Sequence, residues 1–218
     1  MQSYLDKSGD YFAHARKEIE PLLPEKCDRV LEIGCGSGAT LGWLRQQQHA
    51  LRTVGVEIAE SAAETARGFA DEVYCLDFER HDLPSDADQF DLVLCLDVLE
   101  HMVDPWKVVD RLASKYLDTG GTLIVSLPNV RHYSVVLPLL FGGRWDYEDA
   151  GLLDRTHLRF FTKASAKNLL IHPQLRMVSC RSTGFDGWSG KRVLNVITLG
   201  IFQELVTYQY YLSVCKIP

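Results

Sequence analysis

The stretch Val30–Ala39 reads VLEIGCGSGA, an apolar run with one carboxylate that is followed by glycine at every second position. Helix-favouring residues continue to Arg45. This pattern predicts a strand, a tight turn and a helix. Glycine permits positive φ and lets the backbone approach a ligand closely, and the first N–H groups of the helix have no partner within it. The stretch therefore predicts a turn that binds a nucleoside-containing cofactor.

The charge beside this turn indicates which cofactor binds. The glycines and Ala39 also fit the dinucleotide pattern G-x-G-x-x-G/A. A dinucleotide would bring an anionic pyrophosphate close to the carboxylate of Glu32, which repels it. S-adenosylmethionine carries an ammonium and a sulfonium and no phosphate, so Glu32 favours it. A second apolar strand over residues 53–57 ends in Glu57, which can accept both ribose hydroxyls in either cofactor class.

At this point the chain resembles the class I S-adenosylmethionine-dependent methyltransferases, whose first motif is an acid followed by G-x-G-x-G. Within them it is most similar to the small-molecule, ubiquinone-biosynthesis-like group (methyltransferase types 11 and 12). The resemblance implies a single α/β domain over residues 1–218, with a doubly wound, mostly parallel, Rossmann-like sheet of seven strands whose last strand is antiparallel. It also implies methyl transfer from S-adenosylmethionine to an oxygen or nitrogen of a small-molecule acceptor, with S-adenosylhomocysteine as product.

Two other functions stay open. An NAD(P)-dependent oxidoreductase would share the glycine turn, but Glu32, the Glu100-His101 pair and the absence of a recognisable Tyr-x-x-x-Lys weaken that hypothesis. A module that binds S-adenosylmethionine without catalysis conflicts with no feature of the sequence.

Composition indicates the partners and the compartment. The chain has 218 residues, 46% of them hydrophobic, which is enough to bury the core of one α/β domain. A formal net charge of -6 argues against nucleic acid, whose binding needs a clustered basic face. The six cysteines have no C-x-x-C spacing, which indicates reduced thiols and a cytoplasmic protein. No signal peptide and no long uncharged apolar run is evident, so we expect no stable membrane insertion.

Further cofactor contacts follow from the order of the strands. The resemblance implies that Asp77 accepts a hydrogen bond from the adenine amine and that Phe78 covers the ring. A fourth strand over residues 90–96 ends at Cys95 and Leu96, and both should face the sulfonium because ligands of open α/β sheets gather at the carboxyl ends of strands.

The spacing predicts a leading helix over residues 4–20, ended by Pro21. The resemblance implies that this segment folds over the amino-acid end of the cofactor, with Tyr11 and Arg16 at its carboxylate. The alternative is an aromatic stripe packed on the sheet. The predicted cofactor-binding residues are Glu32, Gly34, Cys35, Gly36, Gly38, Glu57, Ile58, Asp77, Phe78, Cys95, Leu96 and Tyr11.

The segment after the fourth strand carries Asp97, Glu100 and His101. Positions i, i+3 and i+4 share one face of a helical turn, so three ligands for a divalent ion can converge there. The spacing resembles the arrangement in some ubiquinone-biosynthesis O-methyltransferases and small-RNA methyltransferases. In most relatives, however, the Glu-His pair is a hydrogen-bonded scaffold beneath the site. We therefore predict no metal and regard His101 as one candidate general base.

A candidate substrate cap spans residues 131–161, which form a long connection after the fifth strand. Residues 153–162 resemble part of a bacterial methyltransferase group associated with polysaccharide and cell-surface glycan biosynthesis, which suggests a sugar-bearing acceptor. His157 is the leading candidate for a general base, since neutral imidazole accepts protons near pH 7. The alternative is that His157 and Arg159 anchor the loop by hydrogen bonds.

A second insertion, residues 185–206, separates the last two predicted strands. It contains the apolar run 193–202, which is too short and too interrupted to span a bilayer. A substrate wall and the surface of a homodimer are the favoured interpretations of this run, and an interfacial membrane contact is the third.

Overall fold

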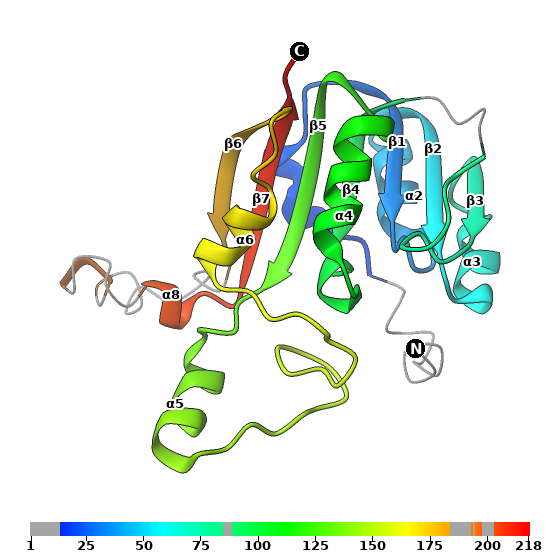
Figure 1. Ribbon diagram of the computed structural model, residues 1–218. Coiled ribbons are helices and arrows are strands. Elements are labelled where there is room, and N and C mark those ends of the chain that lie inside the picture. Colours follow the sequence, from blue (N-terminus) through cyan, green and yellow to red (C-terminus); the bar gives the residue numbers. More distant parts are fainter. Residues whose placement is uncertain (1–13, 85–88, 184–192, 194, 198–202) are drawn as a thin grey trace.

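A computed structural model of the protein describes residues 14–84, 89–183, 193, 195–197 and 203–218. Seven strands form one sheet in the order β3-β2-β1-β4-β5-β7-β6 (Figure 1). β7 runs antiparallel to both of its neighbours, whereas β1 to β5 pair in parallel. The predicted mostly parallel sheet with an antiparallel last strand is therefore confirmed. The strands are β1 (Cys27–Ile33), β2 (Ala50–Glu57), β3 (Glu72–Cys75), β4 (Phe90–Leu96), β5 (Leu117–Pro128), β6 (Leu175–Ser182) and β7 (Gln209–Lys216).

Helices connect the strands in the described part of the chain. The α-helices are α2 (Ala39–Gln46), α3 (Glu60–Ala66), α4 (Pro105–Arg111), α5 (Tyr133–Gly142), α6 (Lys163–Leu169) and α8 (Gln203–Val206). Two 3-10 segments, η2 (Lys17–Leu22) and η3 (Leu99–His101), and one π-helical turn, η4 (Leu112–Tyr116), complete them. In these residues no helix is both long enough and apolar enough to cross a membrane.

The core lies on both faces of the sheet. On β1, Leu31 and Ile33 join the apolar cluster shared with α4 and α6, whereas Val30 joins the cluster shared with η2 and α2. Side chains of a strand alternate between the two faces, so a strand that is covered on both faces must be apolar throughout. This explains why β1 and β4 read as continuous hydrophobic runs.

The segment after β5 leaves the body of the domain. α5 and residues 143–161 extend beyond the carboxyl ends of the parallel strands, then return to α6 (Figure 1). This is the segment that the sequence predicted as a cap. It lies at the edge of the sheet where open α/β folds bind their ligands.

The leading helix differs from the prediction. Residues 1–13 lie outside the described part of the chain, and residues 14–16 are not helical. The following turn is 3-10 rather than α, and it contains Pro21 instead of ending before it. Proline lacks only its own backbone donor, so a short turn of six residues accommodates it while Ile19 and Leu22 remain buried.

Candidate active site

The turn between β1 and α2 requires glycine. Gly34, Gly36 and Gly38 have φ values of 71°, 54° and 81°, all in the left-handed region that side chains disfavour. A Cβ at Gly34 would lie 2.7 Å from Val98 Cγ2, and a Cβ at Gly38 would lie 3.0 Å from the Cα of Ala66. The turn thus brings bare backbone to the carboxyl edge of the sheet, as the sequence predicted.

Two cavities lie at this turn. The first, about 330 Å³ in volume, is here called the polar cavity, and its walls include Arg16, Glu32, Asp97, Glu100, His157 and Tyr208. The second, about 600 Å³, is called the apolar cavity, and its walls include Glu57, Ile58, Asp77, Phe78, Val98 and Leu158. Gly34 and His101 line both cavities, so the two cavities are adjacent.

The carboxylate of Glu57 organises the glycine turn. One oxygen accepts a hydrogen bond from the N–H of Gly36 at 2.9 Å, and the other accepts from the N–H groups of Ile58 and Ala59 at 2.8 and 2.9 Å. The side chain is 1% exposed, and this burial raises its pKa. A carboxylate has about four acceptor positions, so Glu57 retains about one of them, for a single ribose hydroxyl. Its bracing of the turn was not predicted, because strand spacing does not reveal such a contact.

Glu32 presents a buried oxygen to the polar cavity. The residue is 3% exposed, and among the described residues its Oε2 has no hydrogen-bond partner. Burial raises the pKa of Glu32 to about 8, although the Thr40 hydroxyl and the Arg16 guanidinium oppose the rise. A cationic ligand would stabilise the ionised form. The ammonium and sulfonium of S-adenosylmethionine fit this site, and a pyrophosphate does not.

The residues predicted to hold adenine line the apolar cavity. The Asp77 carboxylate accepts from the N–H of Glu79 at 3.0 Å, which fixes its direction. The Phe78 ring is 3% exposed, with the Arg111 guanidinium 4.4 Å from its centroid and the Tyr116 ring at 5.6 Å. The contacts of Asp77 and Phe78 with the base stay predictions.

The structure separates Cys95 from Leu96. Leu96 and Cys35 line the polar cavity, whereas Cys95 is fully buried in the core and lines neither cavity. Successive side chains of a strand point to opposite faces, so the prediction that both residues of β4 face the sulfonium is wrong for the Cys95 side chain. Tyr11 lies outside the described residues.

Asp97 joins three parts of the chain at the polar cavity. Its Oδ1 accepts from the Ser126 hydroxyl at 2.7 Å and from the Gln209 amide, and its Oδ2 pairs with Arg16. Its φ of 53° places it in the left-handed region. The helical turn begins only at Leu99. Asp97 therefore does not share a helical face with Glu100 and His101, and the arrangement of three ligands that the spacing would allow is not assembled.

A different trio is assembled instead. Glu100, His101 and His157 place possible ligand atoms within 4.8 Å of one another. His157 Nε2 lies 4.0 Å from Glu100 Oε1, and the two imidazole rings meet edge to face with centroids 4.7 Å apart. Glu100 is 1% exposed, and burial raises its pKa to about 8. The two predicted general bases thus lie side by side. The sequence indicated Glu100 as part of the Glu-His pair, but its proximity to His157 was not predicted because it depends on the path of the cap.

The cap is fastened directly to this trio. The backbone carbonyl of Glu100 accepts from the N–H groups of Leu158 and Arg159 at 2.8 and 3.0 Å. The Arg159 guanidinium donates to the carbonyl of Val103. The cap therefore holds His157 at the polar cavity through contacts with one carbonyl within η3 and one just after it.

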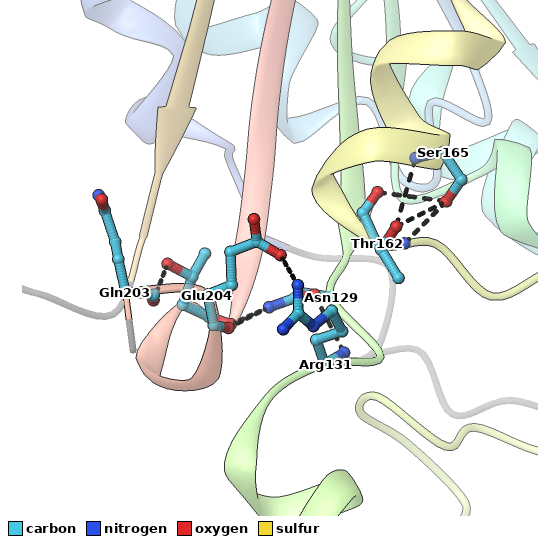
Figure 2. A network of polar contacts seen from close by, with 7 residues as sticks. Asn129, Arg131, Thr162, Ser165, Gln203 and Glu204 are labelled. Atoms are coloured by element: carbon cyan, nitrogen blue, oxygen red, sulfur yellow. Dashed lines mark hydrogen bonds and ion pairs between the residues drawn. The ribbon is translucent and has the colours of Figure 1, made fainter. Parts of the chain in front are cut away.

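A second network fixes the opposite wall of the polar cavity. The Asn129 amide is fully buried and donates to the carbonyls of Glu204 and Thr207 at 2.6 and 2.7 Å (Figure 2). Arg131 pairs with the Glu204 carboxylate at 2.6 Å (Figure 2). The N–H of Asn129 donates to the carbonyl of Tyr208 at 2.9 Å. These contacts position Tyr208 and Gln209, which line the polar cavity. No recognisable sequence pattern indicated either residue as part of a site.

A family model described as a methyltransferase domain matches residues 6–179, most of the chain. The chain belongs to this methyltransferase family. The predicted class I S-adenosylmethionine-dependent methyltransferase is confirmed at this level, and neither the oxidoreductase nor the non-catalytic alternative gains support.

Relatives of this methyltransferase domain agree with the assignment. The chain is 30% identical over 135 residues to the ubiquinone biosynthesis O-methyltransferase of Coxiella burnetii. The matched region is 59% of this chain and 55% of that protein. It thus spans about half the length of the curated relatives it matches. Its fold is similar to that of a SAM-dependent methyltransferase from Archaeoglobus fulgidus, with a TM-score of 0.64 and 18% identity over 99% of this chain and 97% of that chain. It is also similar to the plantazolicin methyltransferase BpumL in complex with SAH (TM-score 0.61, 19% identity, 100% and 84% covered).

Proposed function

We propose that this methyltransferase domain transfers the methyl group of S-adenosylmethionine to an oxygen or nitrogen of a small-molecule acceptor. The observation that carries the proposal is the buried oxygen of Glu32, which has no hydrogen-bond partner among the described residues and lies beside a turn of three glycines with positive φ. Among nucleoside cofactors, S-adenosylmethionine matches it because its non-nucleoside end is cationic. The S-adenosylmethionine-dependent activity named for structural relatives supports the same cofactor.

The two cavities match the two halves of this cofactor. The apolar cavity suits the adenosine moiety, with Glu57 at the ribose and Asp77 at the base. The polar cavity suits the amino-acid end, where Arg16 and Glu32 supply a cation for the carboxylate and an anion for the ammonium. The reacting methyl group would then lie near Gly34 and His101, where the cavities meet.

When bound, S-adenosylmethionine supplies a methyl group that is activated by the adjacent sulfonium. The chain has to place the attacking atom about 3 Å from that methyl in a water-poor site. His157 can receive the acceptor proton: its Nδ1 lies 3.2 Å from the carbonyl of Leu152, which only accepts, so the neutral ring carries its lone pair on Nε2. The roles of His157 and His101 as bases stay predictions.

We infer a hydroxyl-rich, for example sugar-bearing, acceptor from the remaining walls. Asp154, Tyr208 and Gln209 line the polar cavity beside His157 and offer both hydrogen-bond donors and acceptors. The net charge of -6 favours such an acceptor over nucleic acid. Since residues of the cap line the same cavities as the sheet, we also infer that the chain acts as a single domain.

Calorimetry with S-adenosylhomocysteine and with NADH tests the cofactor. We expect binding of S-adenosylhomocysteine alone, weakened about tenfold or more in Glu32→Gln because a buried charge-assisted contact is lost. Glu64→Gln, an exposed acid on α3, is the matched control and should bind normally. Binding of NADH without S-adenosylhomocysteine would refute the proposal. Single-turnover transfer of labelled methyl to fractionated metabolites would then identify the acceptor.

A further inference from the structure

We propose that Arg111 positions the adenine of the methyl donor by holding Phe78 from behind. The inference rests on the proposed function, because it requires that S-adenosylmethionine binds with its base in the apolar cavity. Phe78 lines that cavity, whereas Arg111, the last residue of α4, lines neither cavity. Arg111 therefore acts on the base through Phe78 and does not touch it.

The guanidinium of Arg111 contacts both the side chain and the backbone of Phe78. Its Cζ lies 4.4 Å from the centroid of the ring, within the range in which a cation is attracted to an aromatic face. Its Nη2 donates a hydrogen bond to the Phe78 carbonyl. One charged group thus fixes the ring together with the peptide group beside it, and neither can turn without losing that contact.

The polar atoms of Arg111 indicate that Phe78 determines where the guanidinium lies. The Nε of Arg111 is buried and has no hydrogen-bond partner among the described residues, although buried donors are normally satisfied. Its ion pair with Asp82 Oδ1 is 3.5 Å long, which is longer than a typical hydrogen bond. An arginine that served mainly to bind a carboxylate would form two short, parallel hydrogen bonds with it. The guanidinium is thus placed for the ring and carbonyl of Phe78.

Neighbouring side chains hold the loop after β3 against α4 and η4. The Tyr116 ring on η4 lies 5.6 Å from the Phe78 ring. The Tyr116 hydroxyl donates to Asp82 Oδ1 at 3.1 Å and accepts from the N–H of Leu83 at 2.9 Å. Lys115 pairs with the other carboxylate oxygen of Asp82 at 2.9 Å. The loop is therefore attached at both ends, by Arg111 at its start and by η4 at its end.

A ring that is fixed before the ligand arrives favours binding of the base in two ways. A side chain that is free to turn loses this freedom when a ligand packs on it, whereas the Phe78 ring is already held by Arg111 and Tyr116. Two aromatic faces are both negative and repel one another when they stack directly, and a cation against the Phe78 ring reduces this repulsion. Arg111 is therefore a positioning residue whose effect on binding depends on the Phe78 ring.

A double-mutant cycle measured by calorimetry with S-adenosylhomocysteine tests this dependence. We expect Arg111→Met to weaken binding about fivefold to tenfold. In the Phe78→Leu background, Arg111→Met should have little further effect, because residues that act as one unit are not additive. Arg111→Lys, which keeps the cation, should bind more tightly than Arg111→Met. Lys115→Met is the matched control and should bind normally: Lys115 also pairs with Asp82, but its Nζ lies over the Tyr116 ring, 5.2 Å from the centroid.

NMR spectra of bound S-adenosylhomocysteine protect the test from misfolded variants. In the natural chain, the Phe78 ring should shift the adenine H2 and H8 resonances upfield. This shift should shrink in Arg111→Met and persist in Lys115→Met. If the natural chain binds the ligand without such a shift, or if the losses of affinity in the double variant are additive, the role of Arg111 is overturned and the proposed function stands. If the natural chain does not bind S-adenosylhomocysteine, both are overturned.

Discussion

At the level of single residues, the carboxyl of Glu32 makes a testable connection between burial and binding. Its pKa is raised from 4.5 to about 8, so at pH 7 most folded molecules without ligand hold a proton there. The ammonium group of the bound ligand favours the ionised form of Glu32, so binding is expected to release that proton. We expect the affinity for S-adenosylhomocysteine to increase as the pH rises toward 8. Calorimetry in buffers of different ionisation enthalpy should detect proton release on binding at pH 7. Glu32→Gln should abolish the share of the released protons that comes from Glu32.

Gly34 provides a second prediction. Gly34→Ala combines a left-handed backbone with a Cβ 2.7 Å from Val98 Cγ2, whereas Gly120, with φ of 84°, has nothing within 4 Å of such a Cβ. Gly120→Ala should therefore cost about 1–2 kcal/mol from backbone strain alone, and Gly34→Ala should cost more and weaken S-adenosylhomocysteine binding. Equal losses of unfolding free energy in urea would show that crowding at Val98 is unimportant.

The role of a residue could be predicted from the sequence where a single physical requirement determines which residue type can stand at that position. The glycines, Glu32 and Glu57 are such positions, because backbone conformation and ligand charge restrict them directly. The orientation of Cys95 and the partners of Asp97 could not be predicted in the same way. The orientation of Cys95 depends on which face of β4 its side chain takes. The partners of Asp97 include a side chain more than a hundred positions away, Gln209.

At the level of elements, the attachment of the cap to η3 determines the position of His157. The side chain of Arg159 strengthens this attachment, because its guanidinium donates a hydrogen bond to the carbonyl of Val103. Arg159→Ala should remove about 1 kcal/mol of local stability and increase amide hydrogen exchange over residues 153–160, with little change in α2. Arg155→Ala, which removes an exposed pair with Asp149, is the control and should leave exchange at residues 157–160 unchanged.

The N-terminus of α6 gives a prediction about stability alone. Thr162 accepts from the N–H of Ser165 while the Ser165 hydroxyl accepts from the N–H of Thr162, a reciprocal capping box (Figure 2). Thr162→Ala should lower the free energy of unfolding by about 1 kcal/mol, measured by urea denaturation. A change below the experimental error would show that the box contributes nothing.

Elements with strong periodicity were predicted well. The predicted fourth strand, residues 90–96, has the bounds of β4. η3 was not predicted as a 3-10 turn beginning at Leu99, so the shared face that helical spacing would give Asp97, Glu100 and His101 does not form. A pattern of i, i+3 and i+4 indicates a shared face only where the helix already exists.

At the level of the whole molecule, Asn129 connects the sheet to the far wall of the polar cavity. It is fully buried and its amide donates two hydrogen bonds (Figure 2). Asn129→Ala would leave those carbonyls unsatisfied, so we expect a loss of about 2–3 kcal/mol and an increased KM for the acceptor. Binding of S-adenosylhomocysteine should change little. Asn168→Ala, on the exposed side of α6, is the control; equal effects on cofactor and acceptor would contradict the assignment of this wall.

In the described part of the chain, the two cavities have just Gly34 and His101 in common. The cap lines both cavities, the polar one with Gly151, Asp154 and His157 and the apolar one with Arg155, Thr156 and Leu158. Glu32 and Glu57, at the ends of β1 and β2, lie outside the cap. The architecture permits a new acceptor to be acquired by replacing a loop while the two acids proposed to hold the methyl donor are inherited unchanged.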